Sequence, residues 1–493
     1  MKNIVIVGGG TAGWMAANLF INKWADKGVS VTLVESPEVG IIGVGEGSTP
    51  TLKRFFEMIN VTESDWMSRC NATYKTNIVF SGWSPKSGIS AYSHPFPTQV
   101  DNFTTRAFMV NCRTRRLGLD TNVCPENFLL NGVLARQGKG PKTPENFPFK
   151  IEYGYHFDSH LLGEFLAELA IKRGVKHIKA HVAQVVLADN GDISSLHTRQ
   201  GEQIFGDLYI DCTGFAGILM KKTLGIKFTS FKRNLFNDSA IVMPSPISTN
   251  IPSQTVSTAL SAGWAWKIPL QNRFGNGYVY SSDFISDEQA ELEFRKHLGM
   301  LDEQHECRKL SMAVGQLEQH WAHNCLALGL SQGFIEPLEA TALHLVQISI
   351  EFFMDQYEAG EFSAKHRETY NQKMSERFER VRDYIVAHYK LNTRDDSEYW
   401  QANRENQHLS TALLQLLDVW FQRKDLAQEI ERQQLDTHFD AVSWHCLLAG
   451  YGAFPPLAEN QPGKGCLYQD QQVEKFMAGC ALNFSSHTKN LFV

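Results

Sequence analysis

A glycine-rich turn near the start of the chain constrains the fold more than any other feature. The run G-G-G-T-A-G over 8–13 follows a β-rich segment over 4–7 and opens a helical pattern over 11–24. A second apolar segment over 29–34 leads into Glu35, which lies 22 positions after the last glycine of the run. This is the spacing of a βαβ unit with a G-x-G-x-x-G turn, so we predict a Rossmann-like α/β domain.

Each part of this turn has a physical role in holding a dinucleotide. The first glycine permits the tight turn, the second lets the backbone approach a pyrophosphate, and the third allows close helix packing. The helix N-terminus stabilises the anion, and the acidic residue accepts a hydrogen bond from a ribose hydroxyl. A purely structural glycine turn is the alternative, but the coincidence of two strands, a helix and an acid favours a dinucleotide. The predicted contacts are Gly8, Gly10, Thr11, Ala12, Gly13 and Glu35.

A second motif favours FAD over a nicotinamide cofactor. Asp211-Cys212-Thr213-Gly214 closes a predicted strand and resembles the second flavin contact of glutathione-reductase-like flavoproteins, which implies contacts at Asp211 and Gly214. No second G-x-G-x-x-G exists to hold a separate nicotinamide cofactor. We therefore expect the flavin to arrive reduced, or to be reduced by a transient partner.

Composition excludes several classes of function. The 493 residues include 47 Lys plus Arg and 53 Asp plus Glu, a net charge of -6, so capture of nucleic acid or anionic membrane is not expected. No apolar run is long enough to span a bilayer, and we interpret the N-terminus as a mature cytoplasmic start. The nine cysteines are scattered without metal-ligand spacing, which predicts reduced thiols and no metal site.

The remaining patterns divide the chain into a mixed α/β part and a helical part. Between 40 and 150 we expect short strands and long connections, and beyond 340 mostly helix. Further predicted elements are a helix over 160–173, strands over 176–180, 182–187, 206–211 and 326–330, and antiparallel sheet over 225–285.

Three more segments resemble flavin-dependent halogenases, and the tryptophan halogenase group in particular. The run G-W-A-W-K-I-P over 263–269 matches the Trp-x-Trp-x-Ile-Pro signature of that family. The run G-V-G-E-G-S-T-P over 43–50 is similar to its second flavin loop and implies a flavin contact at Gly47. The run G-F-I-E-P-L-E-A-T over 333–341 resembles the segment with its catalytic glutamate and halide site. The resemblance implies further flavin contacts at Leu330 and Leu343.

The resemblance also implies the catalytic pair. Lys75 lies in a strand pattern over 73–80, in which it shares a face with Thr73 and Asn77. By itself such a lysine is usually solvated, whereas the family places its catalytic lysine there. Glu339 is either a helix-start acid or, by resemblance, the carboxylate that holds the halogenating species and takes up the ring proton.

Backbone N–H groups of Thr341 and Ala342 would bind halide at the start of the same helix. Ala340 and Ala342 replace the Ser and Gly that are usual in the family, so the choice between chloride and bromide stays open.

The substrate pocket is implied by His94, Phe96 and Trp400, whose rings would enclose an electron-rich aromatic ring. A loop histidine and a packing tryptophan are the alternatives. Tryptophan-specific members bind the amino-acid group with tyrosines and an acid near this tryptophan, and here the match, His388-Tyr389 and Asp395-Asp396, is partial. Together with the chain's modest length, this predicts that a smaller or differently substituted indole, such as free indole, is a better substrate than free tryptophan.

The sequence thus predicts an FAD-binding α/β domain of the glutathione-reductase and aromatic-hydroxylase type, with an inserted antiparallel sheet and a mostly helical C-terminal lobe. We expect a discontinuous flavin and halogenation core over 1–340, with its sheet at about 225–320, and a helical lobe over 341–493 that contributes to the substrate pocket. FADH2 from a separate reductase, O2 and chloride or bromide would give HOX, which reaches Lys75 and Glu339. A FAD-dependent aromatic monooxygenase and a catalytically silent flavin-binding protein are the alternatives, and a homodimer is left open.

Overall fold

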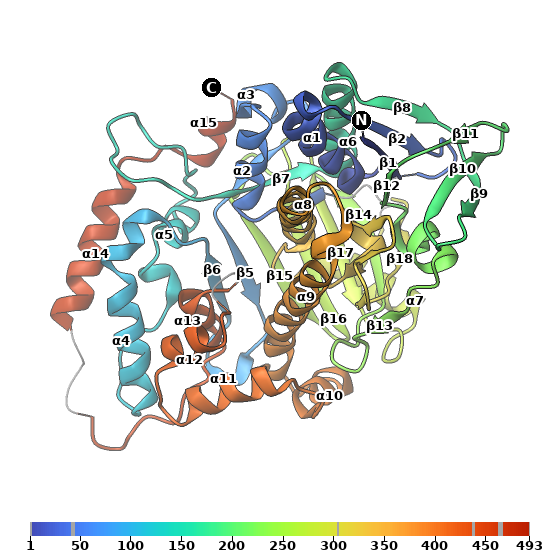
Figure 1. The fold of residues 1–493 in the computed structure, drawn as a ribbon. Helices are drawn as coiled ribbons and strands as arrows, with labels where there is room; N and C mark the ends of the chain where they lie inside the picture. The colour runs from blue at the N-terminus through green and yellow to red at the C-terminus, as the bar shows by residue number, and fades with distance from the viewer. Residues whose placement is uncertain (1, 41–44, 303–304, 436–438, 462–466, 493) are drawn as a thin grey trace. The chain divides into compact units, whose positions relative to one another are not determined.

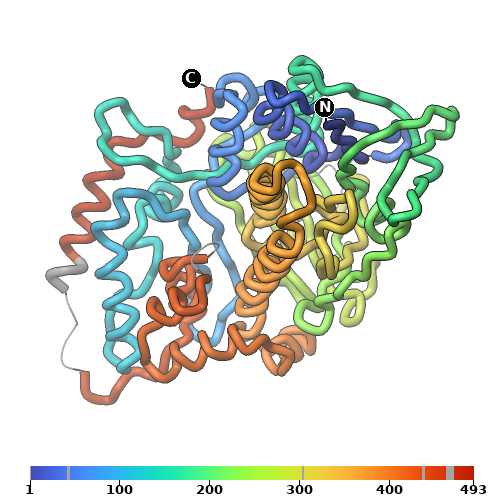
Figure 2. Tube along the Cα trace, viewed as in Figure 1, coloured from blue at the N-terminus to red at the C-terminus, as the bar shows by residue number. Residues whose placement is uncertain are grey.

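The computed structural model describes residues 2–40, 45–302, 305–435, 439–461 and 467–492. The chain forms two compact units, each assembled from three separate segments (Figures 1 and 2). The first unit comprises Met1–Ala72, Phe157–Lys232 and Met312–Glu379, and the second comprises Thr73–His156, Arg233–Ser311 and Arg380–Val493. The expected separation of a flavin and halogenation core over 1–340 from a helical lobe over 341–493 is not tested by these units and stays a prediction.

The first unit is built on a six-stranded sheet in the order β20-β21-β12-β1-β2-β8. All neighbours pair in parallel except β20 and β21. The predicted βαβ unit is confirmed, because the helix has the predicted bounds and the two strands around it are adjacent and parallel. The elements are β1 (Lys2–Val7), α1 (Thr11–Trp24), β2 (Val29–Glu35), β8 (Lys176–Lys179), β12 (Leu208–Asp211), β20 (Trp321–Ala322) and β21 (Cys325–Ala327).

Helices and two small sheets complete the first unit. Helix α1 packs against α6 (Ser159–Lys172) and α8 (Ala342–Ala359) (Figure 1). A hydrophobic core containing Val5, Leu196 and Tyr209 joins the main sheet to an antiparallel sheet, β11-β10-β9. The remaining elements are β9 (Val182–Leu187), β10 (Ile193–Thr198), β11 (Gln203–Ile204), β13 (Phe228–Ser230), β19 (Gly315–Leu317), β22 (Gly333–Phe334), α2 (Thr51–Met58) and α3 (Glu63–Trp66).

The second unit is built on a seven-stranded sheet in the order β18-β14-β17-β16-β15-β5-β6. The predicted antiparallel pairing over 225–285 is confirmed for β14 to β17. The sheet also includes β5 and β6 from the region before residue 100, and β5 pairs with β15 in parallel. Its strands are β5 (Asn77–Ser81), β6 (Ala91–Pro95), β14 (Ser239–Ser245), β15 (Gln254–Leu260), β16 (Gly263–Pro269), β17 (Phe274–Tyr280) and β18 (Arg308–Ser311).

Helices cover this sheet. Helix α7 (Asp287–Leu298) packs Ala290 and Phe294 against Tyr278 on one face. The chain beyond 380 is mostly helical, as predicted, and its helices begin at side chains that accept backbone N–H groups: Ser410 accepts from Leu413 at 3.0 Å. The helices are α9 (Arg367–Lys390), α10 (Glu398–Glu405), α11 (Thr411–Phe421), α12 (Leu426–Arg432), α13 (Ala441–Gly450), α14 (Leu467–Ala481) and α15 (His487–Leu491).

Three local predictions are wrong. The strand expected over 73–80 is two strands, β4 (Thr73–Lys75) and β5, in different sheets, because Thr76 between them donates both its N–H and its hydroxyl to the carbonyl of Ser253 (2.7 and 2.9 Å). The strand expected over 326–330 ends at Ala327. The region 40–150 is not mainly loop, since it also contains α2, α3, α4 (Thr105–Arg116) and α5 (Leu130–Arg136).

Among the described residues, no helix is long and apolar enough to cross a membrane. The eight described cysteines are free thiols, and Cys466 lies outside the described residues.

Candidate active site

The glycine turn of the first unit has the geometry of a dinucleotide cradle. Gly8 has φ +115°, and a Cβ there would lie 2.1 Å from the carbonyl oxygen of Cys212. A Cβ at Gly13 would lie 2.1 Å from the carbonyl oxygen of Gly8, so both positions need glycine to pack. By contrast, no atom of the described residues lies within 4 Å of a Cβ added at Gly10. The space above Gly10 is open and fits a pyrophosphate at the start of α1.

The start of α1 keeps its N–H groups available for that anion. Gly10 provides no side-chain cap, and the first turn of this fully described helix contains no acidic residue. The predicted contacts Thr11 and Ala12 lie in this turn. The positive end of the helix dipole therefore faces the open space beside Gly10.

Glu35 ends β2 as predicted and has a partner that the sequence did not reveal. His177 on the adjacent strand β8 places its Nε2 atom 2.8 Å from Oε1 of Glu35, and its ring packs edge-on against Trp14 with centroids 5.1 Å apart. A Cβ at Gly9 would lie 1.6 Å from Oε2 of Glu35, so the carboxylate reaches the turn only because Gly9 has no side chain. In the sequence, the only sign of this close approach between Glu35 and the turn is that Gly9 lies inside the glycine motif.

Asp211 is fully buried, and its carboxylate accepts backbone N–H groups of Leu219 (2.9 Å) and Met220 (2.8 Å) as well as the hydroxyl of Thr213 (2.6 Å). It therefore holds the turn after β12 in shape. Gly214 in that turn has φ +65° and open space around its missing Cβ. Direct flavin contacts by this segment, and by Leu330 in the turn after β21, stay predictions.

The second flavin loop is described from residue 45 onward, and Gly43 and Val44 lie outside the described residues. Gly47 ends the short strand β3 (Gly45–Gly47). Burial raises the pKa of Glu46 in this strand to about 7, although a hydrogen bond with Ser159 opposes the shift. No role for Glu46 could be predicted from the sequence.

Contacts within the first unit connect the segment after this loop to the start of α8. The Oγ1 atom of Thr51 lies 2.8 Å from that of Thr49 and 3.2 Å from Nδ1 of His344. Burial lowers the pKa of His344 to about 3, so its imidazole is neutral. Arg54 and Glu351 form an ion pair between the same two helices, α2 and α8. The predicted halide site therefore begins a helix that is anchored to the flavin loop.

The turn before α8 is buried and sharply bent. Glu339 is 3% exposed, and Ala340 after it has φ +56°, a left-handed conformation that costs a non-glycine residue about 1 kcal/mol. The hydroxyl of Thr341 is buried and has no hydrogen-bond partner among the described residues. Helix α8 starts at Ala342, with no acidic residue in its first turn, and Leu343 is buried. An orphaned hydroxyl at a helix start fits an anion site.

Lys75 is in the second unit, at the end of β4, and is 0% exposed, which excludes the solvated alternative. Its Nζ atom lies 5.4 Å from the centre of the Phe96 ring. Phe96 follows β6 and is held by a hydrogen bond from its N–H to the carbonyl of Thr76 at 3.0 Å. The structure thus brings together two of the predicted site residues within one unit.

His94 lies two residues before Phe96, in β6, and is 6% exposed, so it is not a loop histidine. Strand registers place it on the same sheet face as Trp266, through the pairs Ile78↔His94 and Ser257↔Trp266. Tyr384 of α9 packs near it, with ring centroids 6.0 Å apart. His94, Trp266 and Tyr384 thus contribute aromatic rings on this side of the sheet.

Trp264 and Trp266 share a face of β16, with ring centroids 6.1 Å apart. A Cβ at Gly277 on the neighbouring strand would lie 2.1 Å from the Trp266 ring, so this glycine gives the indole its place. Both tryptophans are buried, which is consistent with sheet packing as well as with lining a passage.

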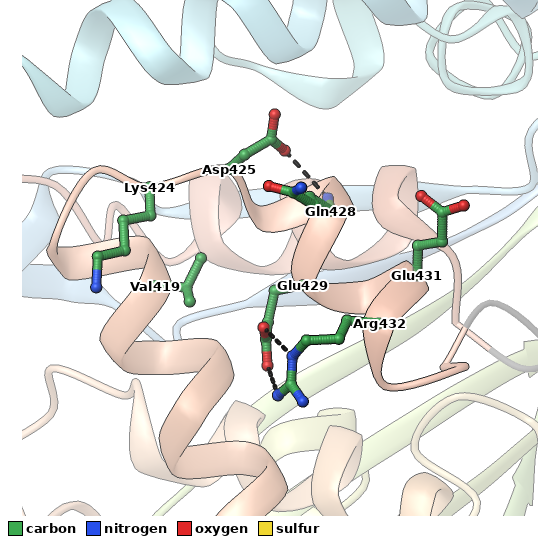
Figure 3. A pocket seen from close by; sticks show the side chains of 7 residues that line it. All are labelled: Val419, Lys424, Asp425, Gln428, Glu429, Glu431 and Arg432. Carbon is green, nitrogen blue, oxygen red and sulfur yellow. Dashed lines mark hydrogen bonds and ion pairs between the residues drawn. The ribbon is translucent and has the colours of Figure 1, made fainter.

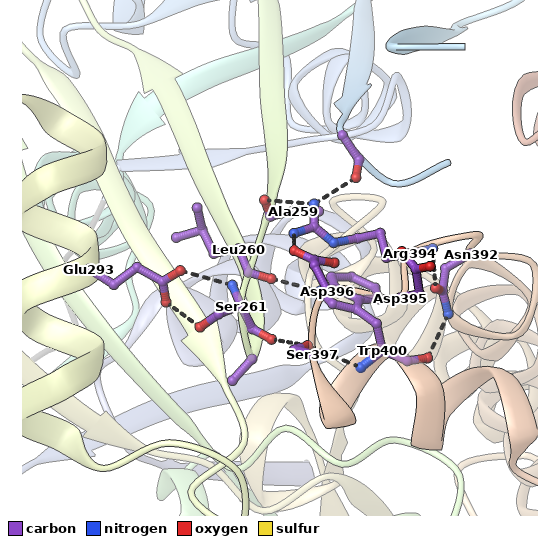
Figure 4. A network of polar contacts seen from close by, with 12 residues as sticks. Ala259, Leu260, Ser261, Glu293, Asn392, Arg394, Asp395, Asp396, Ser397 and Trp400 are labelled. Atoms are coloured by element: carbon purple, nitrogen blue, oxygen red, sulfur yellow. Dashed lines mark hydrogen bonds and ion pairs between the residues drawn. The ribbon is translucent and has the colours of Figure 1, made fainter. Parts of the chain in front are cut away.

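Trp400 is fully buried, and its Nε1 donates to the carbonyl of Leu260 at 2.7 Å (Figure 4). Its ring neighbours include Trp83, with centroids 5.0 Å apart, and Tyr389, at 6.0 Å. None of the aromatic contacts described for Trp400 is with His94 or Phe96. Its role in the substrate pocket stays a prediction.

The acids near Trp400 are engaged by nearby basic groups. Asp395 pairs with Lys86 at 2.5 Å, and Asp396 pairs with Arg394. Arg394 also donates to the carbonyl of Gly82 at 2.8 Å (Figure 4). Of the two aromatic residues upstream, Tyr389 bonds to Asn237 through its hydroxyl at 2.9 Å. The polar side chains of this segment therefore already bond to other residues of the protein.

A surface pocket on α11 and α12 contains none of the predicted site residues (Figure 3). Most of its lining residues are polar or charged, and some pair with one another, as in the bonds from Arg432 to Glu429 at 2.6 and 2.8 Å. We assign it no role in the reaction.

Comparisons with known proteins agree on one family. The family model described as tryptophan halogenase matches residues 3–462. Tryptophan 6-halogenase SttH of Streptomyces toxytricini is 38% identical over 439 residues, which cover 85% of this chain and 83% of that protein. The structure of a tryptophan halogenase from Shewanella frigidimarina aligns with a TM-score of 0.87 at 31% identity, covering 100% of this chain and 97% of that one.

BrvH, a flavin-dependent halogenase from Brevundimonas sp. BAL3, aligns with a TM-score of 0.84 at 30% identity and covers 100% of this chain and 98% of that one. These matches confirm the predicted fold class and the resemblance stated from the motifs. The chain belongs to the tryptophan halogenase family of flavin-dependent enzymes.

Proposed function

We propose that this enzyme replaces hydrogen by chlorine or bromine on an electron-rich aromatic ring of the indole type. The observation that carries the proposal is the complete burial of Lys75 beside Phe96. Burying an amine that is charged in water costs free energy, and titratable groups buried in this way cluster at functional sites. Family membership supports the halogenation chemistry.

The first unit supplies the residues that would hold FAD. The open backbone at Gly10 and the α1 N-terminus would bind the pyrophosphate, and Glu35 would accept from a ribose hydroxyl. When bound and reduced by a separate reductase, the flavin supplies with O2 the oxidation of halide to HOX. The unpaired hydroxyl of Thr341 and the N–H of Ala342 would hold the halide before it is oxidised.

In the ring substitution, Lys75 acts as the proton donor and Glu339 as the proton acceptor. The Lys75 ammonium donates a hydrogen bond to the oxygen of HOX, which polarises the halogen toward the ring. The ring carbon forms a bond to the halogen as the O–X bond breaks, and the hydroxide that leaves takes a proton from the Lys75 ammonium to become water. One proton is thus given up by Lys75 for each proton that the ring loses. The Glu339 carboxylate takes up the proton that the ring loses. Trp264 and Trp266 would separate the flavin from the ring, so that direct hydroxylation does not compete.

The open space at Gly10 provides a test of the flavin site that leaves the fold intact. A Cβ at Gly10 meets no atom of the described residues within 4 Å, so we expect the unfolding midpoint of Gly10→Val to stay close to that of the wild type. FAD affinity should fall at least about tenfold, because the side chain occupies the pyrophosphate space. Equilibrium titration with FAD, followed by flavin fluorescence, measures this.

Gly8→Val is the matched control in the same turn. Its side chain would collide with the carbonyl of Cys212, so it should lower the unfolding midpoint as well. Unchanged FAD affinity in Gly10→Val would contradict the placement of the cofactor.

We further propose that indole is turned over faster than free tryptophan, because Asp395 and Asp396 already pair with Lys86 and Arg394 and leave the amino-acid group without an assigned acidic partner. We expect kcat/KM for indole to exceed that for tryptophan at least about tenfold, since an uncompensated ammonium is costly to desolvate.

The measurement is mass spectrometry of an indole panel with FAD, a reductase, NADH and either halide. A preference for tryptophan would refute this substrate class, and products that gain oxygen instead of halogen would indicate a monooxygenase.

A further inference from the structure

His156 of β7 (Gly154–Asp158) is fully buried within a hydrogen-bond chain that joins four strands, β16, β4, β7 and β15. The hydroxyl of Thr73 lies 2.7 Å from the carbonyl of Pro269 and 3.0 Å from Nδ1 of His156. Because the carbonyl can only accept, Thr73 donates its single proton there and must accept from His156 Nδ1–H. On the other side of the ring, Nε2 lies 2.9 Å from the hydroxyl of Thr255 and accepts its proton.

These bonds fix His156 as a neutral imidazole in one tautomer. Burial lowers its pKa well below the ordinary value, and the nearby charge of Lys75 lowers it further, as a protonated His487 would. The other groups bonded to the ring, Thr73 and Thr255, are uncharged.

A second histidine holds the same strand from the C-terminal helix α15. His487 accepts from the N–H of Tyr74 at 3.2 Å through Nε2, and its Nδ1 donates to the carbonyl of Ile251 at 2.8 Å. Burial lowers its pKa to about 4, so it too is neutral near pH 7. Strand β4 is therefore held by one histidine through the side chain of Thr73 and by another through its backbone.

The strand geometry directs this arrangement at Lys75. Thr73 and Lys75 alternate onto the same face of β4, and His156 is the β7 partner of Thr73 on that face. The direct partner of Lys75 is Gly154, which has no side chain. His156 is consequently the diagonal neighbour of Lys75, at a backbone separation of about 7–8 Å that a lysine side chain can span.

We propose that His156 is a positioning residue for Lys75. The imidazole links the hydroxyl of Thr73 to that of Thr255 in β15, and Thr73 in turn donates to the carbonyl of Pro269 at the end of β16. These contacts hold β4 in place and so fix the direction of the Lys75 side chain. Because the imidazole carries no charge, it does not oppose the ammonium form. This inference rests on the proposed function, in which Lys75 directs HOX, but the holding of the amine can be measured without turnover.

The first measurement is carbamylation of Lys75 by cyanate in the flavin-free protein, followed by peptide mass spectrometry. We expect His156→Leu and Thr73→Val each to raise the labelling rate at least about fivefold, because the strand that buries the amine is released. His156→Asn should stay within about twofold of the wild type, since its amide nitrogen replaces Nδ1 and still donates to Thr73. Thr73→Val gives the same test with a smaller change in volume.

The second measurement is steady-state halogenation of indole. For His156→Leu we expect kcat to fall about 30- to 100-fold with KM within about twofold, because misplacing a catalytic group by about 1 Å costs on this scale. His156→Asn should recover kcat to within about fivefold. The control is His445→Leu in α13, another buried histidine of the same unit whose pKa burial lowers to about 4, which should lower the unfolding midpoint without a selective loss of kcat.

The outcomes separate the two proposals. Labelling of Lys75 that is the same in His156→Leu, Thr73→Val and the wild type overturns the positioning role, whatever the enzymatic result. Failure of the wild type to halogenate any ring in the panel overturns the proposed function, while faster labelling in the two variants would still support the positioning of the amine by His156.

Discussion

Replacing Lys75 by alanine is expected to lower halogenated product at least about 100- to 1,000-fold while FAD affinity and oxidation of the reduced flavin stay near wild-type levels. The amine is the only group proposed to donate to the oxygen of HOX, and removing one such preorganised donor costs on this scale. Flavin-related properties should persist because the residues proposed to bind FAD lie in the first unit and Lys75 in the second. Quantifying product by mass spectrometry beside flavin oxidation by absorbance gives both readouts from one reaction.

Lys267→Ala is the matched control for this experiment. Lys267 is also a strand lysine of the second unit beside an aromatic ring, with Nζ 4.2 Å from the centre of the Phe274 ring, but it is exposed. Its removal should leave turnover within about twofold of the wild type. Undiminished product from Lys75→Ala would refute the assignment of the catalytic amine.

Replacing Glu339 by glutamine is expected to lower halogenation about 100-fold, because the amide has nearly the shape of the carboxylate but cannot take up the ring proton. Measured against indole, the loss should appear in kcat, and flavin affinity should not change. A deuterated ring position provides a further check, since slow proton loss in the variant should create a kinetic isotope effect on product formation.

Glu336→Gln is the control for Glu339→Gln, because it makes the same chemical change in the same buried turn. We expect it to retain most of the activity after correction for any loss of folded protein. If both variants lose activity equally at equal folded fraction, the turn has a structural role and Glu339 is not the proton acceptor.

The local elements that carry the strongest patterns could be predicted from sequence. The glycine turn with its helix over Thr11–Trp24 formed where the pattern placed it, and β14 to β17 lie within the antiparallel sheet expected over 225–285. Their signals are short in range, because a turn, a helix start and an alternating strand depend on neighbouring residues. The candidate catalytic residues came from motif resemblance, since a lone lysine in a strand pattern does not show whether it is buried.

Features that depend on distant partners could not be predicted. The bend at Thr76 requires the carbonyl of Ser253, which is 177 residues away, and without it Lys75 and Asn77 were placed on one strand. The partner of Glu35, His177, becomes its neighbour only through pairing of β2 with β8. Neither contact can be predicted from the residues that are adjacent in the sequence.

The sequence by itself determined the flavin-type βαβ unit, the antiparallel pairing of β14 to β17, the mostly helical chain beyond 380, and the family, because these depend on local periodicity and on motifs of contiguous residues. Only the tertiary structure decided that Lys75 is enclosed, that Asp395 and Asp396 are already paired, and that His156 is a single neutral tautomer. Burial, charge pairing and proton placement are set by which side chains meet in space, and chains of hydrogen bonds across strands have no period that a sequence can show.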